Sequence, residues 1–338
     1  MHSFGLLAAS FRPKDEICVL RSYLRHRDTL VKDSTVQVER MQKALIQMNV
    51  LLHNVLSDIT GVTGLKILRA IVAGERDALT LARMKHPLIR SDEDTIARSL
   101  RGDYRAEHLF ALRQALELYD TYHVKIDDCD RQIEEHIQRL RSHEHFDPSS
   151  LPPSRPRRKG EPRGDFRPEL YRVADVDLTQ IDGVKVNTVL VLLSEIGPDL
   201  SRFPTEKRFC SWLGLCPNPQ ISGGRNKGDR SRRVVNRAAQ ALRLAAQTLR
   251  KSRSALGAYF RRLLPRLGTA RTIKAVAHKL ARLVYRLLIG STPYNDPGSA
   301  AYEARFRAQQ ILTLTRRANA LGLRIVDPLT APEPEGVS

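Results

Sequence analysis

The chain has no long hydrophobic run and no pattern typical of an amino-terminal signal. No segment approaches the roughly 18 consecutive apolar residues that a membrane-spanning helix needs. The amino terminus, MHSFGLLAASFRPKDE, has no cationic start followed by a long apolar core, so it does not resemble a secretory signal. We therefore expect a cytoplasmic protein that has no membrane partner.

Cysteine is scarce and scattered. The four cysteines are Cys18, Cys129, Cys210 and Cys216, and no histidine or further cysteine follows them at the spacing of a zinc site. Cys210 and Cys216 bracket the apolar stretch SWLGL, which favours buried thiols over a metal pair. The sequence predicts no metal site and no cofactor in this chain.

Acidic residues are almost missing from residues 201–290. This stretch contains 5 Lys and 16 Arg but only Glu206 and Asp229, while the other 248 residues hold 35 basic and 35 acidic side chains. The formal net charge of +19 therefore comes from this one stretch. A solubilising surface usually mixes both signs. A one-sign cluster instead favours a polyphosphate partner, because Lys and Arg displace the counterions condensed on nucleic acid.

Apolar residues recur every seven positions in two segments. The first runs from about Lys14 to Ile59 through Leu24, Val31, Val38, Leu45 and Leu52. The second contains Leu112, Tyr119, Ile126, Ile133 and Leu140. Both predict long helices of the coiled-coil type, separated by short helices broken at Gly61, Gly64 and Gly74. The two helices would pair antiparallel with each other or, equally well, with a second protomer.

A stretch rich in Pro, Gly, Ser and Arg, residues 144–169, predicts an exposed linker between these helices and a basic helical domain. The fold class is therefore predicted as mainly α, with long antiparallel coiled-coil helices followed by that domain. The loop at 214–230 has the composition of a small hairpin. Helices are expected near 186–196, 205–213, 231–251, 254–264, 270–289 and 299–320.

The segment LTQIDGVKVNTVLVLLSEIG has the pattern of a helix-hairpin-helix turn. Ile181, Gly183 and Val184 form an apolar–glycine–apolar turn before an apolar helix. Such a turn points backbone N–H groups at a DNA phosphate, with Gly183 permitting close approach and Lys185 adding charge. The alternative is an ordinary glycine turn between two packed helices.

The segment PNPQISGGRNKGDRSRRVVNRAAQ places a serine beside two glycines and a run of arginines. Gly223 and Gly224 would let a phosphodiester approach Ser222 without side-chain collision. Guanidinium groups could then hold its non-bridging oxygens, and Ser231 would cap the following helix. The alternative is a glycine turn before a basic recognition helix. The expected phosphate-binding side chains are those of Arg225, Lys227, Arg230, Arg232, Arg233 and Arg237.

A serine nucleophile needs a base, a metal ion or a lowered pKa, and the sequence shows none nearby. Asp229 is the nearest acid, and His278 lies two expected helices away. Asp127, Asp128 and Asp130 fall on the polar side of the second heptad helix, which predicts a solvated face. Any activating carboxylates for Ser222 would therefore come from elsewhere.

Several long strings in this order resemble the DEDD insertion-sequence transposases related to the Piv invertase, the insertion-sequence one-ten group. The strings are HSFGLLAASFRP, DITGVTGLKILRAIVAGERD, LTQIDGVKVNTVLVLLSEIG, RFCSWLGLCPNPQISGGRNKG and VVNRAAQALRLAA. The resemblance implies a RuvC-like domain with four acidic metal ligands, a coiled-coil segment and a helical transposase domain. It implies that Ser222 attacks a scissile phosphate to form a covalent protein–DNA intermediate, and that a structured guide RNA is a partner.

The resemblance also implies a division of the chain. The expected segments are 1–13, the end of a RuvC-like domain; 14–143, the coiled-coil segment; 144–169, the linker; 170–290, the transposase domain; 291–326, a carboxy-terminal helix; and 327–338, a tail. No alternating strand pattern with an early Asp precedes Lys14. The expectation is a truncated or mis-started transposase, inactive alone, with Mg²⁺ bound only by the missing domain.

Two alternatives to this hypothesis remain open. The chain could be a non-catalytic remnant that binds nucleic acid through residues 178–290. It could also be a dominant-negative assembly partner, whose coiled coil joins copies of itself or draws full-length transposase into inactive oligomers.

Overall fold

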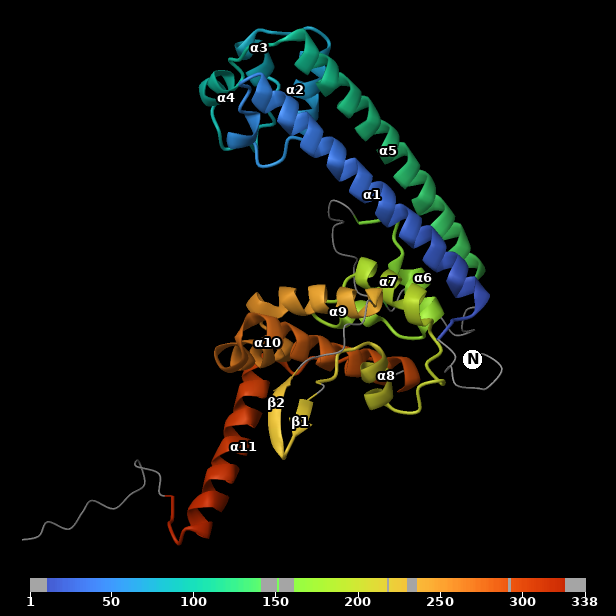
Figure 1. Cartoon of the computed structure of the whole chain (residues 1–338), viewed down its shortest axis with the longest axis vertical. Coiled ribbons are helices and arrows are strands. Elements are labelled where there is room, and N and C mark those ends of the chain that lie inside the picture. The colour runs from blue at the N-terminus through green and yellow to red at the C-terminus, as the bar shows by residue number, and fades with distance from the viewer. Residues whose placement is uncertain are drawn as a thin grey trace, which may run out of the picture. The chain divides into compact units, whose positions relative to one another are not determined.

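In a computed structural model, the chain forms two compact units (Figure 1). The structure describes residues 11–140, 151, 161–217, 219–229, 236–290 and 293–325, with only the backbone at 219–221 and 225–229. Among these, residues 18–140 and 161–165 form one unit, here called the strut unit. Residues 11–17 and 166–325 form the other, here called the basic unit. The prediction of a mainly α fold is confirmed.

Two long helices make up most of the strut unit. They are α1 (Asp15–Gln47) and α5 (Ala106–Arg139). The ring of Tyr23 lies 6.0 Å from that of His136, and Arg27 forms an ion pair with Asp130. The contacting residue on α5 has a lower number when the one on α1 has a higher number, so the two helices are antiparallel within one chain (Figure 1).

The first long helix is shorter than its heptad pattern predicts. Continuation to Ile59 is wrong, because α1 ends at Gln47 and Asn49 adopts a left-handed conformation with φ of 57°. Asparagine tolerates this conformation better than most residues, and it ends a helix. Leu52 opens a one-turn helix, η2 (Leu52–Asn54), and stays fully buried. The seven-residue apolar pattern therefore continues past the end of α1, because Leu52 and Ile59 are buried in a separate core.

That core belongs to the head at the end of the long helices. It is built from α2 (Val62–Val72), α3 (Ala78–Ala82) and α4 (Glu93–Ser99). The carboxylate of Asp77 caps α3 by accepting from the N–H of Thr80, and that of Asp92 caps α4. Gly64 is required by packing, because a Cβ there would lie 2.1 Å from the carbonyl oxygen of Ile59.

One acidic residue of α5 lies in the helix interface instead of on a solvated face. Asp130 is 2% exposed, and its carboxylate bonds the guanidinium of Arg27, which is 4% exposed. It also accepts a hydrogen bond of 2.8 Å from the backbone N–H of Arg163. The prediction of a solvated face is therefore wrong for Asp130. The buried guanidinium of Arg27 requires this partner, because an unpaired buried charge is costly.

The basic unit is a helical assembly with one small hairpin. It contains α6 (Arg167–Ala174), η4 (Leu178–Gln180), α7 (Val186–Ile196), α8 (Glu206–Trp212), β1 (Pro219–Ser222), β2 (Arg225–Asp229), α9 (Arg237–Thr248), η5 (Leu249–Lys251), α10 (Ala255–Gly290) and α11 (Gly298–Ala320). Gly268, with φ of 71°, breaks α10 into two helical halves, close to the two helices expected there. None of the described helices is long and apolar enough to cross a membrane.

Packing in the basic unit joins helices that are distant in sequence. Helix α9 packs between α7 and α10, and α8 packs on α10. A cluster of Phe203, Phe209 and Trp212 forms one part of the core, with ring centroids 5.3 Å apart for Phe203 and Phe209. This packing positions α9 and α8, the two helices that flank the hairpin in sequence.

Candidate functional site

Ser222 lies at the end of the first strand of the hairpin, directly before its turn. Strands β1 and β2 are antiparallel, and Ser222 pairs with Arg225, which leaves Gly223 and Gly224 as the two turn residues. Their φ angles are 59° and 71°. Two-residue hairpins of this kind need positive φ at both positions, which glycine adopts most readily. The hairpin turn therefore explains the glycine pair by itself.

The turn leaves the serine accessible. Ser222, Gly223 and Gly224 are all exposed, and no atom lies within 4 Å of a Cβ built on either glycine. A phosphodiester could therefore approach the hydroxyl from the side of the glycines without steric conflict. The geometry permits the predicted chemistry, although it does not require it.

The basic side chains around the serine are only partly described. Arg225 and Lys227 lie on β2, where the structure gives the backbone alone. Arg230, Ser231, Arg232 and Arg233 lie outside the described residues.

The helix after this block begins later than its sequence pattern suggested. Helix α9 starts at Arg237, and its cap is Asn236, whose side chain accepts a 3.1 Å hydrogen bond from the N–H of Ala239. The prediction that Ser231 caps this helix is wrong. Asparagine is an equally good capping residue, and the two candidates are five positions apart. Arg237 is thus the first residue of the helix and is half-buried.

The turn at Gly183 packs directly on α9. Gly183 has φ of 84°, and a Cβ there would lie 2.9 Å from the carbonyl oxygen of Ala245 and 3.1 Å from the side chain of Leu249. Close packing of the turn on a helix therefore accounts for this glycine without a ligand. A hydrogen bond between Ser252 and Asp182 fastens the same turn to the segment after η5.

Lys185, next to this turn, occupies the capping position of α7. The start of α7 has no side-chain cap, and Lys185 has an extended backbone with ψ of 168°. The first N–H groups of a helix lack partners within it and carry partial positive charge.

The Gly183 turn and Arg237 lie at different points along α9. The turn packs on Ala245, which is eight residues from Arg237, and eight residues span about 12 Å along a helix axis. Gly183 and Arg237 are therefore candidates for two different phosphates.

The fold brings two further cations together near Cys216, which precedes the hairpin by three residues. Lys274 of α10 lies close enough to the thiol of Cys216 and to Arg243 of α9 to interact electrostatically with both. Burial lowers the pKa of Lys274, and the charge of Arg243 lowers it further. The one-sign charge of the region was the sequence signal for these residues, but no local motif marked them.

One carboxylate in this region is fully engaged by arginines. Glu206 accepts from Nη2 of Arg282 at 2.5 Å and from Nε of Arg286 at 2.7 Å. Hydrogen bonds from Arg286 and then Arg282 lower the pKa of Glu206 to about 2. Glu206 is therefore a structural anion and not a free base for Ser222.

His278 is the histidine nearest to Ser222 in sequence and lies on α10. Its pKa is lowered, first by burial and then by the charge of Arg282. The side chain is half-buried, and four residues separate it from Lys274 on the same helix. Within the described parts of the chain, no group of three or more His, Cys, Asp or Glu side chains could hold a metal ion. The described residues therefore offer no site that fits the Mg²⁺ ion that the family resemblance implies.

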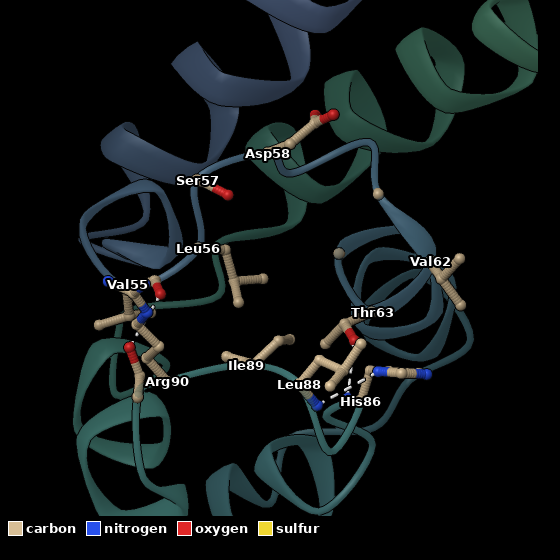
Figure 2. A pocket seen from close by; sticks show the side chains of 13 residues that line it. Val55, Leu56, Ser57, Asp58, Val62, Thr63, His86, Leu88, Ile89 and Arg90 are labelled. Carbon is tan, nitrogen blue, oxygen red and sulfur yellow. Dashed lines mark hydrogen bonds between the residues drawn. The ribbon is translucent and has the colours of Figure 1, made fainter. Parts of the chain in front are cut away.

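A cavity of 560 Å³ lies elsewhere, in the head of the strut unit (Figure 2). Leu56, Leu88 and Ile89 form much of its apolar lining, as Figure 2 shows. The hydroxyl of Thr63, also in its wall, already accepts a 2.9 Å hydrogen bond from the N–H of His86. None of the residues predicted to bind phosphate lines this cavity. It therefore carries no argument for the chemistry at Ser222.

The comparisons with known proteins point to one family. No curated protein matches the chain significantly. Residues 176–261 match the model of the Transposase IS116/IS110/IS902 family. The matched segment includes the Gly183 turn, the hairpin with Ser222, α9 and the start of α10. In this segment the chain is similar to the transposases of that family, which supports a transposase function and DNA binding.

Proposed function

We propose that this chain is an insertion-sequence transposase that binds DNA and cuts and rejoins its strands with Ser222 as the nucleophile. The observation that carries the proposal is the exposed position of Ser222 at a glycine turn, within a segment similar to transposases. The concentration of positive charge in residues 201–290 supports a nucleic-acid partner. A structured guide RNA is part of the proposal through the family resemblance.

The proposed step is a transfer of a phosphoryl group to the serine. The Oγ atom of Ser222 attacks the phosphorus, a new Oγ–P bond forms, and the bond to one bridging oxygen of the DNA strand breaks. The proton of the hydroxyl leaves to a base, and the departing oxygen takes up a proton. Attack by a hydroxyl of a second strand on the same phosphorus would reverse the step and join that strand.

The basic residues would hold the reacting phosphate. Arg225 and Lys227 follow the turn directly, and positive side chains placed there would stabilise charge on the non-bridging oxygens. Gly183 and Lys185 would hold a different phosphate of the same backbone. Glu206 is bound to two arginines, so it is not expected to supply the base for Ser222.

A covalent adduct tests the nucleophile. The full chain of this protein is incubated with a plasmid that carries the insertion sequence encoding it, and with the RNA transcribed from that insertion sequence. DNA linked covalently to protein is then recovered after denaturation. We expect a covalent adduct that Ser222→Ala abolishes. Ser211→Ala is the matched control, because Ser211 is an exposed serine on α8 of the same unit.

The other outcomes are equally informative. An adduct at full yield with Ser222→Ala would show that another residue is the nucleophile. Unchanged DNA binding in both proteins, with no adduct in either, would favour a non-catalytic nucleic-acid-binding protein.

Salt dependence tests the binding itself. If six basic side chains contact phosphates, the logarithm of the association constant for duplex DNA should fall with the logarithm of salt concentration at a slope of about −5. Fluorescence anisotropy with labelled duplexes over a range of salt concentrations measures this slope. Affinity that does not change with salt would contradict a binding surface made of phosphate contacts.

A further inference from the structure

Two cations and three aromatic rings meet where α10 packs on α11. Tyr259 and Arg262 come from the first half of α10, and Lys279 comes from its second half. Tyr302 and Phe306 come from α11. This set, here called the ring–cation cluster, lies outside the block around Ser222. None of its members was singled out by the sequence.

The rings hold both cations at close range. The guanidinium carbon of Arg262 lies 4.1 Å from the ring centroid of Phe306 and 5.4 Å from that of Tyr259. The Nζ atom of Lys279 lies 4.5 Å from the centroid of Tyr259. Distances within about 6 Å are those of cation–π attraction, so the cluster restricts both side chains before any ligand arrives.

Cation–π contacts attract these cations without neutralising them. Burial lowers the pKa of Lys279, and the charges of Arg262, Arg282, Arg286 and Arg305 lower it further. Two of these arginines already bond the carboxylate of Glu206. Positive charge is therefore concentrated around Lys279 at an energetic cost that a bound anion would relieve.

The donors of the two cations suit a particular anion. A guanidinium group offers several N–H donors in one plane, and an ammonium group offers three that rotate freely. Aromatic faces interact with the charge and leave N–H groups available at the edges. Together such groups match the two non-bridging oxygens of a phosphodiester, in the way that Arg and Lys commonly bind phosphate.

We propose that Arg262 and Lys279 form a binding site for a phosphodiester of the nucleic-acid backbone at the junction of α10 and α11. This proposal deepens the proposed function, because it rests on a nucleic-acid partner. It is independent of the role of Ser222. The rings preorganise the two cations, so less side-chain freedom is lost when the phosphate binds.

The test compares charge-removing variants of the full chain. Lys279→Met and Arg262→Met keep an apolar stem for packing and remove the cation. Arg316→Met is the matched control, because Arg316 is an exposed arginine on α11 outside the cluster. Affinity is measured by fluorescence anisotropy for duplex DNA, single-stranded DNA and RNA of equal length, each at several salt concentrations.

Each cluster variant should lose one phosphate contact. The slope of log affinity against log salt for the preferred nucleic acid should become shallower by about 0.9 for each variant on duplex DNA, or about 0.7 on a single strand. Lys279→Arg should restore most of the slope, whereas a purely structural role would not require a charge. The nucleic acid with the largest change identifies whether DNA or RNA supplies the phosphate.

Two results would overturn the proposal. One is a slope in both cluster variants no different from that of Arg316→Met, with circular dichroism unchanged. The other is a lower melting temperature with an unchanged slope, which would show that the cluster only holds α11 against α10. If the unchanged chain forms no Ser222-dependent adduct but the cluster variants still show the slope effect, the proposed chemistry is refuted and this site stands.

Discussion

Residues 18–140 contain 19 basic and 18 acidic side chains, whereas residues 201–290 contain 21 basic and 2 acidic ones. Arginines of the strut unit form ion pairs with carboxylates of the same unit: Arg27 with Asp130, Arg69 with Asp120, and Arg163 with Asp127. Within residues 201–290, Glu206 forms ion pairs with two arginines, and Arg262 and Lys279 lie against aromatic rings.

The difference separates a part built for internal stability from a part built for binding. A unit whose charges are paired internally gains little from an external polyanion. A unit that concentrates cations retains an unfavourable self-repulsion that a nucleic acid removes. Substitutions in the strut unit should therefore change stability, and charge substitutions in the basic unit should chiefly change binding.

The largest expected effect is at the buried ion pair. Arg27→Met leaves the carboxylate of Asp130 buried without its cation, and such a loss costs about 3–5 kcal/mol. Hydrogen exchange of the backbone amides of α1 and α5 measures the loss of stability. Arg69→Met is the control, because Arg69 and Asp120 form an exposed pair with side chains 54% and 48% accessible. Exposed pairs contribute at most about 1 kcal/mol.

A double variant distinguishes charge from packing. Arg27→Met combined with Asp130→Leu should recover most of the lost stability, because both charges are then absent and the site is apolar. Equal costs for Arg27→Met and Arg69→Met would contradict the buried character of the Arg27–Asp130 pair.

A smaller effect is expected at two glycines, one in each unit. Gly74 has φ of 107° with nothing near its missing Cβ, whereas Gly183 has φ of 84° and faces a carbonyl oxygen at 2.9 Å. Gly74→Ala should cost about 1–2 kcal/mol through backbone strain alone. Gly183→Ala adds a steric conflict and should cost about 1 kcal/mol more. Hydrogen exchange within each unit measures both changes, and equal costs would contradict the packing of the Gly183 turn on α9.

Much of the architecture was predictable from periodicity, because a helix that buries one face repeats its apolar residues. Helices α5, α7 and α11 lie close to their predicted positions. The end of α1 was missed because Leu52 and Ile59 continue the seven-residue period into the head core, where another surface buries them. Only the backbone conformation of Asn49 marks the break.

The pairings between distant residues were not predictable. Asp130 lies 103 positions from Arg27 and has the local sequence pattern of a solvated residue, so the sequence did not indicate this pair. The ring–cation cluster likewise joins three helical segments. At the candidate site, the glycine pair and the hairpin were predicted from composition, whereas Asn236 replaced Ser231 as the cap. Serine and asparagine cap helices about equally well, so the sequence alone does not rank them.

The smallest expected change concerns the carboxylate of Glu206 in the basic unit. The pKa of Glu206 falls from 4.5 to about 2 because Arg286 and Arg282 donate hydrogen bonds to its ionised form. A carboxyl group with a lowered pKa in the folded state stabilises the fold above about pH 4.5 and loses that contribution as the pH falls toward 2. The arginine side chains are 43% and 60% accessible, so solvent screening limits the contribution to about 1 kcal/mol.

Glu206→Gln should therefore lower the stability of α8 and α10 at pH 7 and flatten its decline between pH 4.5 and 2. Asp77→Asn in the strut unit is the control, because the pKa of Asp77 is lowered by hydrogen bonds from Thr80 and asparagine caps a helix equally well. Thermal unfolding at a series of pH values compares the two variants with the unchanged chain. A decline that remains equally steep in Glu206→Gln would show that the ion pairs of Glu206 with Arg282 and Arg286 do not stabilise the fold.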